Sequence, residues 1–337
     1  MKRLILSIVI GAVAALVLNQ FYSYFFQYDL IYFRKAHDIS SQYEEQLRKD
    51  GQPCVIFAGG SEIRAAVRPS VMLAEEGIRA VNAGMAAPNG IQANAAIGLQ
   101  HVRPGDTFVL SHISTADKNL VPTAGGIKTA VQLYGFSAFH KELMPLNLDA
   151  VSLLLSSDAA NIFINSIRKL TRGYSFIYKK HAQVHQDGWL EVHLPYLHNN
   201  NRAFPANQTA PIISNAALTW IKQLQTECTK KGADFIIMIP VGCYEEREKT
   251  NRLLQILQLC RSGIIVLRDE RLGSNPDTSL YSDTLYHMNA RGAAENSRIL
   301  ARLIKEKKYW TEQEILAKMK ELGFTKDDTP QLPATAI

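Results

Sequence analysis

The sequence predicts an α/β fold, a three-layer α/β/α sandwich in which helices cover both faces of a parallel sheet. Apolar runs of strand length alternate with segments of helical character along most of the chain, as they do in sheets with crossover helices. Turn residues, Gly105-Asp106 and Lys231-Gly232, stand where a predicted helix ends and the next predicted strand begins. The 337 residues are 47% hydrophobic, so the chain has ample material for a buried core.

The individual elements follow from the apolar patterning. The first strand, 53–57, is fully apolar and runs into two glycines, which permit a turn that a residue with a Cβ would resist. The predicted strands, in chain order, span residues 53–57, 79–82, 107–111, 234–240 and 263–267. The predicted helices that alternate with them span residues 63–75, 91–101, 215–231, 245–260 and 290–305.

The N-terminus predicts a membrane anchor. Lys2 and Arg3 precede an apolar run over 4–18, and the aromatic-rich segment 21–26 prolongs it to a length that could span a bilayer. Ala12-Val13-Ala14 resembles a signal-peptidase site, but cleavage there would leave a very short apolar region and a new N-terminus that is still apolar. We therefore expect an uncleaved signal anchor over residues 1–28, a single pass through the inner (plasma) membrane, with the bulk of the chain periplasmic or otherwise extracytoplasmic.

The remaining chain divides into three predicted parts. Residues 29–50 form a polar, largely helical stalk, and residues 51–308 form the α/β domain. The alternation breaks over 114–213, which is too long for a plain loop and predicts an insertion that shapes a binding surface. In the last part, 309–337, Thr311 opens an amphipathic helix with capping-box spacing, and a disordered, Pro-containing tail follows.

Four histidines of the insertion admit two interpretations. His181 and His185 are four residues apart, which would suit a metal site on a helix, and His193 and His198 follow. No carboxylate constellation accompanies them and their flanks are not firmly helical, which favours a solvated loop. No metal and no organic cofactor is expected.

The distribution of charge and the spacing of the cysteines bear on the partners and on the disulfides that the chain could have. The net charge is +6, but Lys and Arg are scattered without the dense runs that follow a phosphate backbone, which argues against a nucleic-acid partner. The cysteines show no C-x-x-C spacing, and Cys54 is expected to be a small buried hydrophobe. Whether Cys228, Cys243 or Cys260 form a disulfide stays open.

Ser61 follows the first strand in the stretch FAGGSEIRAAVRP. A serine at that point suits either the N-cap of the next helix or a nucleophile presented at a strand end. A nucleophile needs a base within hydrogen-bond reach, a group that orients the base, and donors for the developing oxyanion. Arg64, one turn later, admits either contact with an anionic substrate group or a solvated surface position.

Asp283 and His287 lie in a short loop after the last predicted strand, and Asn289 or Ala290 opens the next helix. Loops that follow the carboxyl ends of parallel strands gather at one edge of a sheet, so this loop and Ser61 can meet there. Taken alone, the pair suits a polar loop in which Asp283 is a turn residue.

Gly84 follows the second predicted strand in the same way that Ser61 follows the first. A glycine lets a backbone N–H approach a reacting centre closely, and the Ser61 N–H would be the second donor to an oxyanion. Taken alone, Gly84 suits a turn that ends a strand.

Together these features resemble the SGNH/GDSL hydrolase superfamily over about residues 53–305. In that family a nucleophilic serine follows the first strand, a glycine the second and an asparagine the third, and an Asp and a His precede the last helix. Ser61, Gly84, Asp283 and His287 match in order and in strand context. The resemblance implies that Ser61 is the nucleophile, His287 its base and Asp283 the group that orients the base, with the Ser61 and Gly84 N–H groups as oxyanion donors.

The sequence departs from the family pattern in two places. The family spaces its Asp and His as D-x-x-H, whereas Asp283 and His287 are one residue further apart, as in the D-x-x-Y-H-x-N form of membrane-anchored members. The third strand runs into VLSHISTADKN without a clear G-x-N-D, so the side-chain oxyanion donor is unassigned, and loss of one such donor costs about a hundredfold or more in turnover. The candidate replacements are Ser111, His112, Ser114 and, from the neighbouring loop, Asn89.

With the N-terminal anchor, the motifs GGSEIR and YHMN look like the envelope-polysaccharide acylation branch of this superfamily. That branch includes the protein that helps to place D-alanine on teichoic acids and the accessory proteins of membrane-bound O-acyltransferases in exopolysaccharide acetylation. The resemblance implies Ser-His-Asp transfer of an O-acetyl or other acyl group to or from a cell-envelope or extracellular polysaccharide. The implied partners are a glycan or acyl ester substrate and a membrane-bound O-acyltransferase.

Two alternatives stay open. One is a non-catalytic SGNH-like accessory or scaffold for a membrane-bound O-acyltransferase. The other is a periplasmic esterase that acts on small or lipid esters without a glycan acceptor.

Overall fold

The structure is a computed structural model that describes residues 28–111, 123–138, 182–193, 212–243 and 249–324, together with separate positions within 2–18 and 143–152. The strands are β1 (Val55–Ala58), β2 (Ala80–Asn82), β3 (Thr107–Ser111), β4 (Ala182–Val184), β5 (Leu190–Val192) and β6 (Asp234–Met238). The helices up to β3 are α2 (Tyr28–Leu47), α3 (Ser61–Ala66), α4 (Pro69–Glu76), η1 (Ala87–Asn89) and α5 (Ile91–Gln100). The later helices are α6 (Ala124–Tyr134), η3 (Gly135–Ala138), α9 (Asn215–Lys230), α10 (Lys249–Arg261), η6 (Thr278–Leu280), α11 (Ala290–Lys305) and α12 (Glu312–Glu321).

The main sheet has four parallel strands in the order β2-β1-β3-β6. The register pairs Phe57 in the central strand β1 with Val109 in β3. The predicted parallel α/β fold is therefore confirmed, with four of the predicted strands in the sheet. The predicted fifth strand, 263–267, forms instead one parallel bridge, between Val266 and Ile237 of β6.

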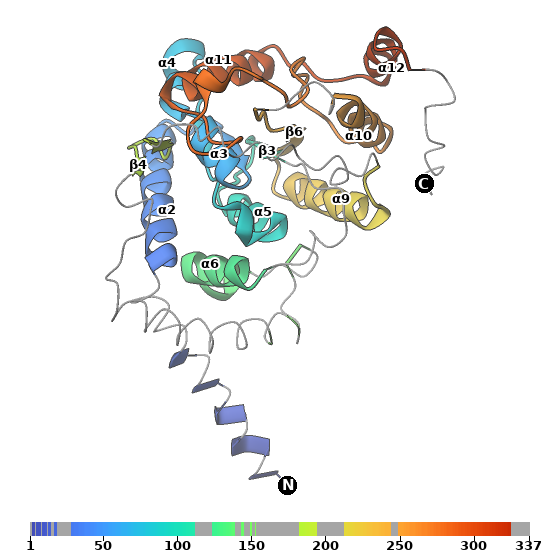
Figure 1. The fold of residues 1–337 in the computed structure, drawn as a ribbon. Coiled ribbons are helices and arrows are strands. Elements are labelled where there is room, and N and C mark those ends of the chain that lie inside the picture. The colour runs from blue at the N-terminus through green and yellow to red at the C-terminus, as the bar shows by residue number, and fades with distance from the viewer. Residues whose placement is uncertain are drawn as a thin grey trace.

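Alternate residues of β1 enter two different hydrophobic cores, one on each face of the sheet. Ile56 and Ala58 belong to a core that is completed by α5, α9, α10 and α12. Val55 and Phe57 belong to a second core that is completed by α3, α4 and α11. This alternation is what a strand buried on both faces requires, and Figure 1 shows the two groups of helices on either side of the strands.

The segment predicted as a helical stalk does form a helix, α2. This helix packs into the domain instead of standing apart from it as a stalk. Glu44 accepts a hydrogen bond from Arg48 Nε at 2.7 Å and lies 2.5 Å from His101 Nδ1. Arg48 also binds Asp106 with two guanidinium nitrogens, and Asp106 accepts from the Cys54 N–H at the start of β1. The polar side chains that suggested a solvated stalk are in fact paired with partners far away in the sequence.

Two helix starts differ from the sequence prediction and one agrees with it. The predicted helix 63–75 is divided into α3 and α4, because Pro69 begins α4 and the preceding backbone at Arg68 is extended. The N-cap of α3 is Gly60, so Ser61 is the first helical residue and does not cap the helix with its side chain. The capping box of α12, between Thr311 and Glu314, is present as predicted.

All four cysteines are free thiols. Cys54 and Cys228 are buried, and burial raises the pKa of Cys54 to about 11. Cys54 therefore behaves as the small core residue that the sequence predicted.

Several predictions fall on residues outside the described ranges. These are most of the anchor 1–28, the histidines at 181 and 198, the greater part of the insertion 114–213, and the tail from 325. Within the part of the chain that is described, no helix combines the length and apolar character needed to cross a bilayer.

Candidate active site

Ser61 stands where the sequence predicted it, just beyond the carboxyl end of the central strand β1. Gly59 and Gly60 form the turn before it, and both are needed for close approach rather than for an unusual backbone angle. A Cβ on Gly60 would lie 3.0 Å from the Ala87 backbone nitrogen, and one on Gly59 would lie 2.9 Å from the Ser111 Cβ. The turn is therefore packed tightly against the loop that follows β2 and against the end of β3.

Asp283 and His287 form a hydrogen-bonded pair in the loop between η6 and α11. The Nδ1 atom of His287 lies 2.8 Å from Oδ1 of Asp283. The loop is closed by two hydrogen bonds, a backbone bond from Ser282 N–H to the His287 carbonyl and a bond from His287 N–H to the side-chain oxygen Oγ1 of Thr284. With only 4% of its surface exposed, His287 is held in one orientation by this loop.

The loop of His287 and the turn of Ser61 meet at the same edge of the sheet, as the parallel topology predicted. Two observations place them together. The side chain of Glu62, next to Ser61, interacts electrostatically with His287 and with Tyr286. The end of α3 at Ala66 shares a hydrophobic cluster with Met288. Among the described residues, no hydrogen bond joins Ser61 Oγ to His287, and catalytic contacts of this kind often tighten only when substrate binds.

Glu62 is a site residue that the sequence analysis missed. Its Oε1 accepts from the Gly60 N–H at 2.7 Å and from the Ser111 hydroxyl at 3.3 Å. Burial raises the pKa of the Glu62 carboxyl above its usual value, although the Gly60 N–H, the Ser111 hydroxyl and His287 oppose the shift. The signal in the sequence was the acidic residue directly after the serine, which nothing in the pattern assigned to a role.

The Gly84 N–H, predicted as an oxyanion donor, is engaged within the chain. It donates to Asn82 Oδ1 at 3.1 Å. The Asn82 side chain in turn donates to the carbonyls of Ile63 and Val67, so it joins the end of β2 to α3. A Cβ on Gly84 would come within 2.7 Å of the Arg64 backbone nitrogen. In this conformation Gly84 allows the close packing of β2 on α3, and its N–H is not free for a ligand.

The candidate side-chain donors to the oxyanion differ in whether they are free or bonded within the chain. Ser111, at the end of β3, is buried and its hydroxyl donates to Glu62. Asn89 is only 4% exposed, and its Nδ2 is a buried donor without a partner among the described residues. It lies in η1, the turn whose Ala87 nitrogen approaches Gly60. An unsatisfied buried donor next to the Ser61 turn is the kind of group that binding sites retain. His112 and Ser114 lie outside the described residues.

Arg64 is buried, so the interpretation of it as a solvated surface residue is wrong, whereas its contact with an anionic substrate group stays a prediction. It is 3% exposed and donates to the carbonyls of Gly84, Ala36 and Gly188. It also donates to Ser40 Oγ at 3.0 Å. Burial lowers the pKa of Arg64 to about 10. The guanidinium therefore ties α2, α3, the end of β2 and the β4–β5 hairpin together.

The described histidines of the insertion form no metal centre. His185 Nε2 lies 2.7 Å from Glu191 Oε2 across the β4–β5 hairpin, and His193 Nδ1 lies 3.9 Å from the other oxygen of Glu191. Within the described ranges, no cluster of three or more histidine, cysteine or acidic side chains gathers around a common point.

Comparison with known proteins adds no relative to this picture. No protein-family model matches the chain, and neither a search of curated proteins nor a search of solved structures found a match. The assignment of a function therefore rests on the residues and geometry described above.

Proposed function

We propose that this chain is an SGNH-type serine acyltransferase or esterase that acts outside the cytoplasm on an acyl ester of a cell-envelope or extracellular polysaccharide. The observation that carries the proposal is the 2.8 Å contact between His287 Nδ1 and Asp283 Oδ1, in a loop that lies beside the glycine turn bearing Ser61. The parallel α/β sheet and the order of Ser61, Asp283 and His287 along it support the same assignment.

In the proposed reaction, Asp283 fixes the tautomer of His287 in which Nδ1 carries the proton, so that Nε2 is free to accept one. Nε2 takes the proton of Ser61 Oγ as that oxygen attacks the acyl carbonyl. The tetrahedral intermediate collapses, the alcohol leaving group receives the proton from His287, and an acyl-serine remains. A sugar hydroxyl or water then gives its proton to His287 and takes the acyl group, which restores Ser61.

The oxyanion requires donors that are free when the substrate binds. The Ser61 N–H at the start of α3 and the orphaned Nδ2 of Asn89 are the groups that meet this requirement best. Ser111 becomes a third donor if the Glu62 carboxyl, which now accepts its hydroxyl hydrogen, turns away. Gly84 supplies a donor only after its bond to Asn82 is broken.

The cellular setting is part of the proposal. The apolar N-terminal segment suits an anchor in the inner membrane, with the catalytic domain on the periplasmic side and a membrane-bound O-acyltransferase as partner. No cofactor takes part in the proposed mechanism.

A direct experiment is acetyl-ester turnover by the full-length chain in detergent micelles, with and without added polysaccharide. We expect activity in the wild type that is lost in Ser61→Ala and His287→Ala. Turnover that both variants retain would refute the proposal, because it would come from another site.

A second function, that of a non-catalytic accessory to an acyltransferase, is favoured by one observation. In this conformation the Gly84 N–H and the Ser111 hydroxyl are both engaged within the chain. An accessory predicts that Ser61→Ala leaves polysaccharide acylation in cells unchanged, whereas the enzyme predicts that acylation is lost.

A further inference from the structure

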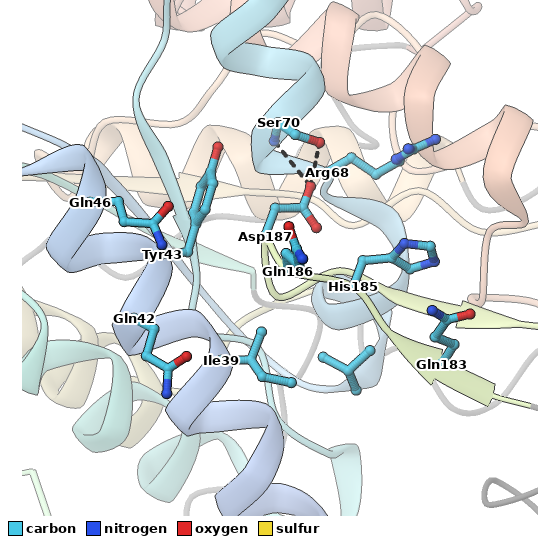
Figure 2. A pocket seen from close by; sticks show the side chains of 11 residues that line it. Ile39, Gln42, Tyr43, Gln46, Arg68, Ser70, Gln183, His185, Gln186 and Asp187 are labelled. Carbon is cyan, nitrogen blue, oxygen red and sulfur yellow. Dashed lines mark hydrogen bonds between the residues drawn. The ribbon is translucent and has the colours of Figure 1, made fainter.

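A polar groove of about 700 Å³ opens between α2, the loop before α4 and the β4–β5 hairpin. Figure 2 shows side chains from these three elements facing one another across it. The hairpin is one of the described parts of the insertion that the sequence predicted to shape a binding surface. The volume is within the range of about 300–1,000 Å³ that is typical of ligand sites.

Four glutamines dominate the chemistry of the groove. Gln42 and Gln46 lie one turn apart on α2, and Gln183 and Gln186 lie on the hairpin opposite. All four are exposed, and none has a hydrogen-bond partner among the described residues. Each amide offers two donors and an accepting oxygen, so the walls present donors and acceptors in equal measure.

The charges in the groove are few and balanced. Asp187 is committed to the protein, because it accepts from the Ser70 N–H and hydroxyl and from the Trp189 N–H. Arg68 carries the cation, and its guanidinium lies 4.3 Å above the centre of the Trp189 ring. One arginine opposite one aspartate does not suit a polyanion, which requires a cluster of cations.

The groove also lacks the features of a peptide or lipid site. Its apolar lining is limited to Ile39, Val184 and the body of Tyr43. Peptide partners are held by buried aromatic or aliphatic anchors in well-packed pockets, and acyl chains need a continuous apolar wall. The ligand that remains is uncharged and carries many hydroxyl groups, each of which donates and accepts as an amide does.

We propose that this groove binds a neutral oligosaccharide segment. The inference deepens the proposed function, and rests on it in one respect, since the groove would then hold the glycan whose hydroxyl or ester reacts at Ser61. The wall is preformed: Arg64 bonds Gly188 at the hairpin turn to Ala36 on α2, and Trp189 Nε1 donates to the Ala65 carbonyl at 2.8 Å. Because Ala65 belongs to the same short helix as Ser61, the groove and the reactive serine share one rigid support.

The test is isothermal titration calorimetry of the full-length chain in detergent micelles. The neutral probes are cellohexaose, maltohexaose, mannohexaose and chitohexaose, and hexagalacturonate is the anionic comparison. We expect at least one neutral hexaose to bind. The double variant Gln42→Ala with Gln46→Ala should weaken that binding about tenfold or more, since it removes two hydrogen-bonding side chains.

Three further variants make the result specific. The hairpin pair Gln183→Ala with Gln186→Ala should weaken binding in the same way from the opposite wall. Gln313→Ala, an exposed glutamine of α12, should leave binding unchanged. Failure of all four neutral hexaoses to bind, binding that neither glutamine pair alters, or binding of hexagalacturonate alone would each overturn the proposal.

Ser61→Ala separates the groove from the chemistry. If a hexaose binds to Ser61→Ala but the wild type shows no turnover that depends on Ser61, the groove proposal is supported and the acyl-transfer function is refuted. Ser61-dependent turnover without hexaose binding would do the reverse.

Discussion

The imidazole of His287 lies 2.8 Å from the carboxylate of Asp283, four residues earlier in the same loop. The one-residue excess over the D-x-x-H spacing does not separate the two side chains, because the loop closes between them. Tyr281 and Met288 pair as an antiparallel bridge at its base, and Thr284 Oγ1 accepts from the His287 N–H at its tip. The extra residue is absorbed by this closed loop.

The orientation of His287 by Asp283 gives the first prediction. Asp283→Asn should lower kcat for acetyl-ester turnover by about 10³- to 10⁴-fold, because an amide no longer holds the imidazole in the productive tautomer. The matched control is Asp277→Asn, which changes an exposed N-cap of the nearby η6. Full activity in Asp283→Asn would show that the pair has only a structural role.

Glu62 gives a prediction on stability against pH. Its folded-state pKa is raised, so the native state holds the proton more tightly than the unfolded state, and stability falls as pH rises above the usual glutamate pKa. Glu62→Gln removes this loss, and should raise the melting temperature relative to wild type at pH 7 while the difference shrinks toward pH 4. A difference that is largest at low pH would contradict the account.

Arg64 should be a stability residue. Arg64→Met leaves the carbonyls of Gly84, Ala36 and Gly188 without their donor, and should lower the free energy of unfolding by about 3 kcal/mol or more. Urea denaturation measures the effect. The control is Arg298→Met, since Arg298 forms a solvent-exposed pair with Glu75 and its loss should leave the free energy of unfolding nearly unchanged. If Arg64 bound substrate instead, stability would stay constant and KM would rise.

His37 on α2 predicts a loss of stability in mild acid. Burial, reinforced by the neighbouring His101 and Arg64, lowers the pKa of His37 to about 3. As pH falls, the unfolded state therefore binds the His37 proton before the folded state does. The stability that burial of neutral His37 provides is complete above about pH 6.5 and is lost as pH falls toward 3. The limiting slope is ~1.4 kcal/mol per pH unit.

His37→Gln should flatten this dependence when urea denaturation is compared at pH 7.5, 6 and 5. His193→Gln, at an exposed position, serves as the control. An unchanged slope in His37→Gln would mean that other groups govern the acid sensitivity.

Much of this arrangement was predictable from the sequence, since it depends on local patterns. Apolar runs fixed the strands, and parallel topology then brought the Ser61 turn and the His287 loop to one edge. The break between α3 and α4 was also predictable, because the residue before a proline, here Arg68 before Pro69, disfavours a helical backbone. The helical periodicity on either side of this step concealed the signal.

The rest required contacts between segments far apart in the chain. Arg64 is buried because α2 and the β4–β5 hairpin surround it with carbonyl oxygens, which no pattern near residue 64 reveals. The same is true of the segment 29–50, in which Arg48 binds Asp106 and Glu44 binds His101, both far away in the sequence. The direction in which Glu62 points, toward Gly60 and Ser111, likewise depends on how the turn after β1 packs against the end of β3.

The most direct measurement of the central claim is covalent labelling of the full-length chain with a fluorophosphonate, followed by mass spectrometry of the modified peptide. The reagent reports an activated serine without requiring the natural substrate. The account predicts a single label on Ser61 that is abolished in His287→Ala, in a protein whose melting curve shows that it is still folded. No labelling of folded wild type, or labelling of Ser61 that is unaffected by His287→Ala, would contradict it.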